Sequence, residues 1–215
     1  VDTVDGPGVV AAPARTKNSA GEERIISAAW NGPVRIFDTA GQQLWESESE
    51  GFSSAATPLL IPDDNLPGGV VIAVLVGGKN YPPIGSNSEV VWLDADTGAT
   101  LKRKRLEGFS GMDPIVFDVD GDGTQELIVS PGQIDAEGRG SGQLLALDSV
   151  SGEVKASAPL DGVTVATPLI ADLDGDGRAE LVHPNGGGLT CYRLDTQVEQ
   201  GAVLRSYQGD KAPGS

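Results

Sequence analysis

The stretch "DVDGDGTQELIV", residues 118–129, places four acidic side chains and two glycines within nine residues and then becomes apolar. Carboxylates this close together repel one another, so such a loop needs a positive charge nearby to be stable. A second stretch, "DLDGDGRAELVH" (172–183), repeats the acidic and glycine positions at the same offsets. Two copies in one pattern indicate a repeated structural unit that carries a cation-binding loop.

The acidic stretches belong to a longer repeat. The segment "DPIVFDVDGDGTQELIV" (113–129) matches "TPLIADLDGDGRAELV" (167–182), and diverged copies begin at Thr57 and near Ala12. Each unit has a second half with an apolar run, an aspartate and a turn that ends in glycine. Three clear copies of that half are "VRIFDTAGQQLW" (34–45), "VVWLDADTGATL" (90–101) and "LLALDSVSGEVK" (144–155), with "CYRLDTQVEQGAVL" (191–204) as a divergent fourth. The turn pattern predicts a hairpin between two strands.

Each unit therefore contains four short strands, and successive anchoring prolines lie 45 to 56 residues apart (Pro13, Pro58, Pro114 and Pro168). This length and strand number are typical of a propeller blade. The 30 glycines and 14 prolines fit many turns, and no helical periodicity competes. We predict an all-β fold, a β-propeller of about four four-stranded blades. It would form one domain over residues 1–215, with blades at approximately 8–50, 51–107, 108–160 and 161–210.

Composition narrows the classes of partner. The formal net charge of −16 argues against nucleic acid, which is bound through basic patches. No apolar run approaches the roughly 18 residues of a membrane span, so we expect no direct membrane insertion. The single cysteine, Cys191, excludes an internal disulfide. The N-terminal residues lack a basic start and an apolar stretch, so we expect any signal peptide to have been removed. We expect a secreted, periplasmic or cell-surface protein.

The spacing of the acidic loops suits calcium, which takes six to eight oxygen ligands. Alternate aspartates can point to one centre if the backbone curls, and the glycines between them permit that curl. We predict two calcium sites, each formed by three aspartates, one backbone carbonyl and a glutamate. The first comprises Asp118, Asp120, Asp122, Thr124 (carbonyl) and Glu126, and the second Asp172, Asp174, Asp176, Arg178 (carbonyl) and Glu180.

The position of the final acid distinguishes this loop from an EF-hand, which has its glutamate at position 12 and a helix afterwards. Here the acid falls at position 9, and strand-like residues follow. The pattern resembles the FG-GAP/VCBS calcium loop of integrin α-subunit propellers and of many secreted bacterial proteins. The resemblance implies that calcium staples the first two strands of a blade. The two diverged copies have lost the motif, with Lys17 and Ser19 in the first and Pro62, Asp64 and Leu66 in the second, so we expect no metal there.

No catalytic constellation emerges from the sequence. His183 is the only histidine and Cys191 occupies a strand position, so we interpret both as structural. Asp135 and Glu137 are acids outside the calcium loops, and we expect them to be solvated. Trp92 lies beside apolar strand residues and is expected in the core. Quinone-dependent dehydrogenase propellers share the hairpin turn, but their tryptophan signature is absent.

We therefore predict a non-enzymatic, calcium-stabilised propeller that acts as a binding or adhesion module for a glycan or a protein. Two Gly-, Pro- and Asn-rich segments, 77–89 and 130–143, are expected to be loops at one end of the disc that contact the ligand. Tyr81 is the candidate ligand-binding aromatic on the first. One alternative is the propeller module of a polysaccharide lyase-type enzyme. Another is a blade set that self-associates into a larger ring or filament, although we expect a monomer.

Overall fold

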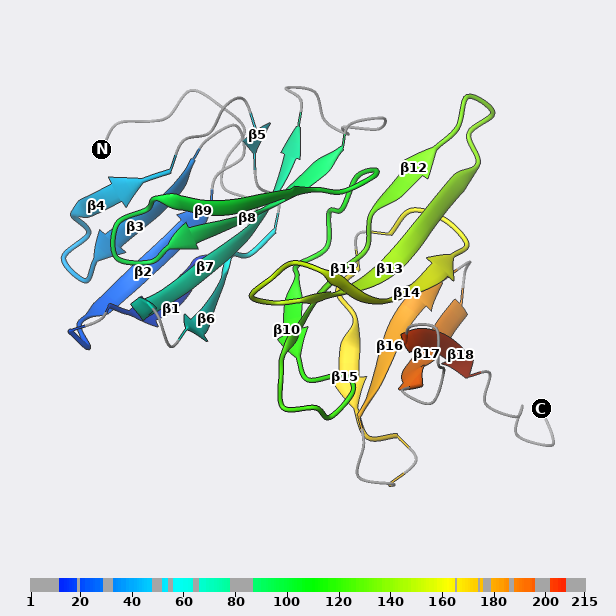
Figure 1. Cartoon of the computed structure of the whole chain (residues 1–215). Helices are drawn as coiled ribbons and strands as arrows, with labels where there is room; N and C mark the ends of the chain where they lie inside the picture. The colour runs from blue at the N-terminus through cyan, green and yellow to red at the C-terminus, as the bar shows by residue number, and fades with distance from the viewer. Residues whose placement is uncertain are drawn as a thin grey trace.

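The computed structural model describes residues 12–18, 20–28, 33–47, 52–53, 56–63, 66–77, 87–164, 166–173, 175, 179–185, 188–195 and 202–207. These residues form β-strands joined by turns (Figure 1). The strands are β1 (Ala14–Lys17), β2 (Glu23–Ala28), β3 (Val34–Asp38), β4 (Gln43–Glu46), β5 (Phe52–Ser53), β6 (Leu59–Asp63), β7 (Leu66–Gly77), β8 (Ser88–Asp94), β9 (Thr100–Arg105), β10 (Ile115–Phe117), β11 (Glu126–Val129), β12 (Gly132–Ile134), β13 (Gly140–Asp148), β14 (Val154–Leu160), β15 (Leu169–Ala171), β16 (Glu180–Asn185), β17 (Gly188–Asp195) and β18 (Ala202–Tyr207).

The strands form four antiparallel blades, which confirms the predicted β-propeller. The first blade is β1–β4, the second β6–β9, the third β10, β11, β13 and β14, and the fourth β15–β18. In each blade the first two strands flank the acidic or diverged loop. In the first three blades the last two strands flank the aspartate–glycine turn. Figure 1 shows the first blade at the left of the molecule and the fourth at the right.

Alternation along each central strand divides its side chains between two neighbouring blades. On β8, Val90 and Trp92 belong to the apolar core shared with the third blade, whereas Val91 and Leu93 belong to the core shared with the first. We call the side of a blade that faces the next blade in the chain its forward face, and the opposite side its back face. The period of two thus explains how one strand contributes to two cores.

Three such cores hold the four blades together. The first blade contributes residues such as Ile26 and Ile36 to its contact with the second blade. The third blade meets the second through Leu127 and Leu147, and its Ile128 meets the fourth blade. At each contact a forward face packs on the back face of the next blade, as expected for stacked propeller blades.

Two tryptophans donate hydrogen bonds between neighbouring blades. Trp45 Nε1 donates to the carbonyl of Ala95, 3.1 Å away in the turn of the second blade. Gly98 ends that turn at φ +76°, and a Cβ there would lie 2.5 Å from the Trp45 ring, so glycine is required. Trp92 is 2% exposed, as predicted for a core residue, and its Nε1 donates to the carbonyl of Ser149, 2.7 Å away in the third blade.

Two features differ from the sequence-based expectation. The segment 130–143 is not an irregular loop, because β12 pairs with the start of β13 and extends the third blade as a hairpin. Its turn is closed by Asp135 Oδ1, which accepts hydrogen bonds from the amides of Glu137 and Arg139. In addition, β14 pairs in parallel with β18, which joins the third and fourth blades into one sheet.

Candidate metal centre

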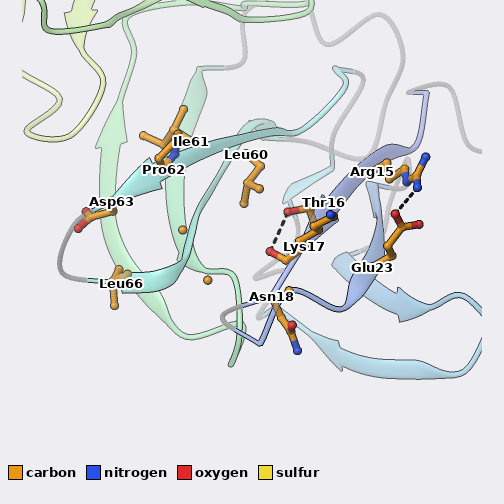
Figure 2. A pocket seen from close by; sticks show the side chains of 13 residues that line it. Arg15, Thr16, Lys17, Asn18, Glu23, Leu60, Ile61, Pro62, Asp63 and Leu66 are labelled. Atoms are coloured by element: carbon orange, nitrogen blue, oxygen red, sulfur yellow. Dashed lines mark hydrogen bonds and ion pairs between the residues drawn. The ribbon is translucent and has the colours of Figure 1, made fainter.

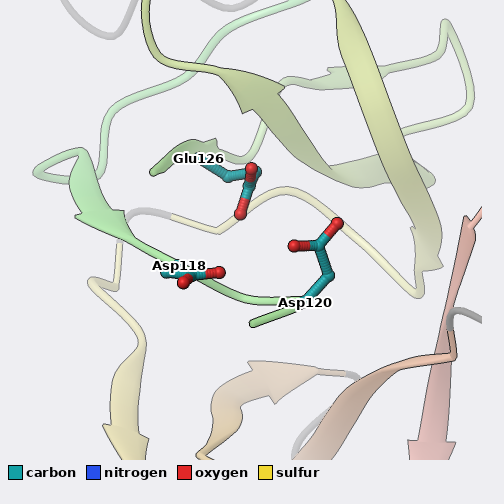
Figure 3. Close-up of side chains that lie close together, drawn as sticks. All are labelled: Asp118, Asp120 and Glu126. Carbon is teal, nitrogen blue, oxygen red and sulfur yellow. The ribbon is translucent and has the colours of Figure 1, made fainter. Parts of the chain in front are cut away.

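The acidic loop of the third blade connects β10 to β11, whose pairing places Phe117 opposite Glu126. Figure 3 shows the side chains of Asp118, Asp120 and Glu126 pointing toward one another. One carboxylate oxygen from each lies within 4.8 Å of the others. Asp118 also shapes the loop, because its two oxygens accept hydrogen bonds from Gly121 N at 2.7 Å and Gly123 N at 3.0 Å. The loop therefore gathers three of the predicted ligands around one centre.

Glu126 is the acidic residue of this loop whose pKa is most strongly raised. Its side chain is fully buried; Oε2 accepts a hydrogen bond from Val119 N at 2.9 Å, and Oε1 has no hydrogen-bond partner. Burial, reinforced by the charges of Asp120, Asp122 and Asp118, raises the pKa of Glu126 to about 7. A buried carboxylate oxygen with no donor is costly. A divalent cation at this point would supply the missing partner, so the donor set fits calcium.

The remaining predicted ligands of the loop lie differently. Asp122 is not part of the three-carboxylate group; its Oδ1 accepts a hydrogen bond from Thr124 N at 2.6 Å. This hydrogen bond lowers the pKa of Asp122, so the side chain stays ionised. Whether Asp122 and the Thr124 carbonyl ligate a metal remains a prediction from the spacing.

The fourth-blade loop repeats this hydrogen bonding where it is described. Glu180 Oε2 accepts from Leu173 N at 2.9 Å, and Asp172 Oδ1 accepts from Gly175 N at 2.7 Å. Glu180, like Glu126, is buried. The other predicted ligands of this loop, Asp174, Asp176 and Arg178, lie outside the described residues. The predicted second calcium site is therefore described only at the two ends of its loop, and calcium there stays a prediction.

The two glutamates differ in the residue that lies opposite each on the neighbouring strand. Glu126 on β11 faces Asp148 on β13. Glu180 instead meets Arg193 of β17, whose Nη2 and Nε donate to Glu180 Oε1 at 2.5 Å and 3.0 Å. The oxygen that is unpartnered in the third blade is thus neutralised by a guanidinium in the fourth. The sequence analysis missed Arg193, and the strand register is what reveals it.

The diverged loops of the first two blades border an open groove of about 780 Å³. Figure 2 shows its walls, formed by the β1–β2 hairpin on one side and the β6–β7 hairpin on the other. Arg15 and Lys17 contribute positive charge, and Glu23 and Asp63 contribute negative charge. Arg15 is paired with Glu23. The charges balance, and these four residues do not reproduce the carboxylate group of the third blade.

The other candidate residues are placed as follows. His183 is fully buried, and its Nδ1 lies 2.6 Å from the carbonyl oxygen of Pro184. Burial lowers the pKa of His183, which favours the neutral ring. Asp135 and Glu137 are not merely solvated, because Arg139 bridges them at 2.8 Å and 3.2 Å. Cys191 is half-buried in β17. Tyr81 and most of the segment 77–89 lie outside the described residues.

The described residues include no helix long and apolar enough to cross a membrane.

Comparison with known proteins identifies the fold. No protein-family model and no curated protein sequence matches the chain. Among solved structures, quinohemoprotein alcohol dehydrogenase from Comamonas testosteroni is similar, with a TM-score of 0.54 and 17% identity over 86% of this chain and 34% of that chain. BamB from Moraxella catarrhalis is also similar, with a TM-score of 0.50 and 16% identity over 86% of this chain and 49% of that chain. The chain thus spans at most about half the length of either protein. At these identities the likeness shows the β-propeller fold alone.

Proposed function

We propose that this chain is a calcium-stabilised β-propeller that works as a binding module and not as an enzyme. The observation that carries the calcium assignment is the buried, unpartnered Glu126 Oε1 beside the carboxylates of Asp118 and Asp120. Oxygen ligands with a concentrated negative charge suit a hard divalent cation. The resemblance of both acidic loops to FG-GAP/VCBS loops supports the same ion in each.

Calcium in this position has a structural role. The loop joins the first two strands of the third blade, and Glu126 begins the second of them. A cation held by residues from both ends of the loop would fix the distance between the strands. Binding to the folded chain alone stabilises it by about 2.7 kcal/mol at 100-fold saturation.

The binding role rests on the β12–β13 hairpin, which extends beyond the body of the third blade (Figure 1). Its tip, residues 135–139, is closed by hydrogen bonds from the amides of Glu137 and Arg139 to Asp135 Oδ1. An ordered tip with fixed charged and hydrogen-bonding groups suits the polar surface of a glycan or a protein, because little ordering is required on binding. Such a module belongs in a secreted, periplasmic or cell-surface setting, where calcium is abundant.

The groups available for catalysis support a binder over a lyase-type enzyme. The one histidine is buried and held against the carbonyl of Pro184. A proton-transferring histidine needs access to substrate and a pKa near the working pH, whereas burial moves the pKa of His183 downward. The two hairpin acids outside the calcium loops, Asp135 and Glu137, are paired with Arg139.

Binding to a glycan array tests the binding role. The array is probed with the wild type and with a hairpin variant, each with and without calcium at about 1 mM. The variant replaces residues 135–139 with a two-residue Asn-Gly turn and leaves Gly132 in place, because Gly132 exchanges hydrogen bonds with Phe109. We expect binding to be lost in the variant while its melting temperature stays close to wild type. Equal array binding by the variant would contradict the assignment of this surface. A full array and a panel of extracellular proteins without any hit would contradict the binding role itself.

A further inference from the structure

The forward face of the fourth blade carries exposed apolar side chains, and no other described blade packs on it. Strand pairing makes Leu169 the counterpart of Ile115, and Leu189 the counterpart of Leu144. Ile115 and Leu144 pack in the core between the third and fourth blades. Leu169 is instead 62% exposed and Leu189 is 77% exposed, with half-buried Val182 between them. Positions that form a core in the third blade therefore face solvent in the fourth.

The back face of the first blade also carries an exposed apolar residue at a position that is buried in the other blades. Ile25 is the counterpart of Val71, Leu127 and Leu181, which are all fully buried, yet Ile25 is 38% exposed. Phe37 lies on the same face and is half-buried. Arg35 and Arg15 also lie on this face, where they are paired with Glu46 and Glu23.

These two faces do not cover each other within one chain. Figure 1 shows the first and fourth blades on opposite sides of the molecule. Each apolar core among the described residues combines consecutive blades, and none combines the first with the fourth. Among the described residues, one forward face and one back face are therefore covered by no other blade.

We propose that the occupant of both faces is a second copy of this chain, arranged head to tail. The argument is continuity, because a forward face already packs on a back face at all three contacts between blades. The fourth blade of one copy would dock on the first blade of the other through Leu169, Leu189, Ile25 and Phe37. Two such contacts related by a two-fold axis close a ring of about eight blades, the upper end of the usual range.

Sedimentation velocity of the full chain tests the proposal, and the expected species has twice the 22.1 kDa mass of one chain. Leu169→Asp and Ile25→Asp should each weaken self-association at least 100-fold, since each puts a charge into both contacts of the ring. Val150→Asp is the matched control, because Val150 is 52% exposed in a turn of the third blade, away from both faces. Far-ultraviolet circular dichroism checks that each variant is folded, as expected for exposed positions.

Mixing the two variants tests the head-to-tail geometry. A Leu169→Asp chain keeps its back face and an Ile25→Asp chain keeps its forward face, so one intact contact remains between them. We expect the mixture to associate more tightly than either variant alone. A monomeric wild type at 100 µM-scale concentration would overturn the proposal. So would a dimer that Ile25→Asp leaves unchanged, because that result would mean that fourth blades pair with each other.

Discussion

The acidic loops of the third and fourth blades share their aspartate spacing but differ in how the buried glutamate is neutralised. Both glutamates accept a backbone hydrogen bond through Oε2 at 2.9 Å. In the third blade Oε1 of Glu126 has no partner, whereas in the fourth Arg193 occupies Oε1 of Glu180. The comparison shows that a loop motif specifies where a cation fits, while the neighbouring strand decides how much the fold needs it. We therefore expect the third-blade loop to bind calcium more tightly.

Removal of calcium should produce the largest change in thermal stability. A saturated site contributes about 2.7 kcal/mol at 100-fold excess of ligand over its dissociation constant. A change of 1 kcal/mol shifts the melting temperature of a protein of this size by roughly 2–4 °C. We expect chelation at pH 7.5 to lower the melting temperature by about 5–10 °C, mostly through the third-blade loop. Magnesium at the same concentration is the control for ionic strength, and an unchanged melting temperature would argue against bound calcium.

The second largest effect should be the pH dependence of calcium binding to the third-blade loop. Without calcium the pKa of Glu126 is raised to about 7, so the folded state holds this proton more tightly than the unfolded state. Its contribution to stability is present below the ordinary value of 4.5 and is lost as the pH rises through 7. Calcium must displace that proton, so its apparent affinity should rise up to about tenfold per pH unit from pH 5 to 7 and then level off.

Calcium titrations at several pH values measure this slope. Glu126→Gln, which cannot ionise at this position, should lose the tighter, pH-dependent binding step altogether. A wild-type affinity for calcium that stays constant between pH 5 and 7 would be incompatible with a protonated Glu126 at the site.

Alanine substitution of one predicted ligand in each loop compares how much each loop contributes to stability. Asp120→Ala removes one of the three gathered carboxylates and should lower calcium-dependent stability by about 2–3 kcal/mol. Asp174→Ala should cost less, about 1 kcal/mol, if Arg193 already neutralises that loop. Asp64→Ala in the diverged second loop should stay within about 0.5 kcal/mol. Urea denaturation with and without chelator gives all three values, and equal losses for Asp120→Ala and Asp174→Ala would erase the proposed difference.

Arg193→Gln sharpens the comparison by making the fourth loop resemble the third. The substitution removes the guanidinium, whose Nη2 donates a hydrogen bond to Glu180 Oε1 at 2.5 Å, and leaves a buried carboxylate without its charged partner. We expect a loss of about 1–3 kcal/mol in chelator, with part of it restored by calcium. Arg139→Gln, which breaks only exposed hairpin ion pairs, is the control. A loss that calcium does not restore would mean that Arg193 has no electrostatic link to a metal site.

The repeat pattern was enough to predict the four blades, because the spacing of prolines, aspartates and turn glycines carries the strand order directly. It also located Asp118, Asp120 and Glu126, which the structure brings together. It did not predict β12, since "PGQIDAEGRGSGQ" resembles a loop in composition and becomes a hairpin only through pairing with β13. Arg193 was missed because its partner Glu180 lies 13 residues away in sequence and becomes adjacent only through the register of β16 and β17.

The contacts between blades were predictable only in part. The unbroken apolar run on β8 predicts two buried faces, but not which blade each face meets. The sequence does not reveal that the Trp45 indole packs on Gly98 and donates to the carbonyl of Ala95 in the next blade. Such contacts between blades depend on the position of one blade relative to another, and the sequence pattern within a single blade does not encode that position.

Isothermal titration of calcium chloride into chelator-treated protein, compared between Glu126→Gln and Glu180→Gln, tests the central claim most directly. The claim is that a calcium ion neutralises Glu126 while Arg193 largely neutralises Glu180. We predict that Glu126→Gln loses the tighter of two binding steps and keeps the weaker, and that Glu180→Gln keeps the tighter step. A Glu126→Gln protein with the full wild-type binding curve would contradict the account, as would loss of the tighter step in Glu180→Gln alone.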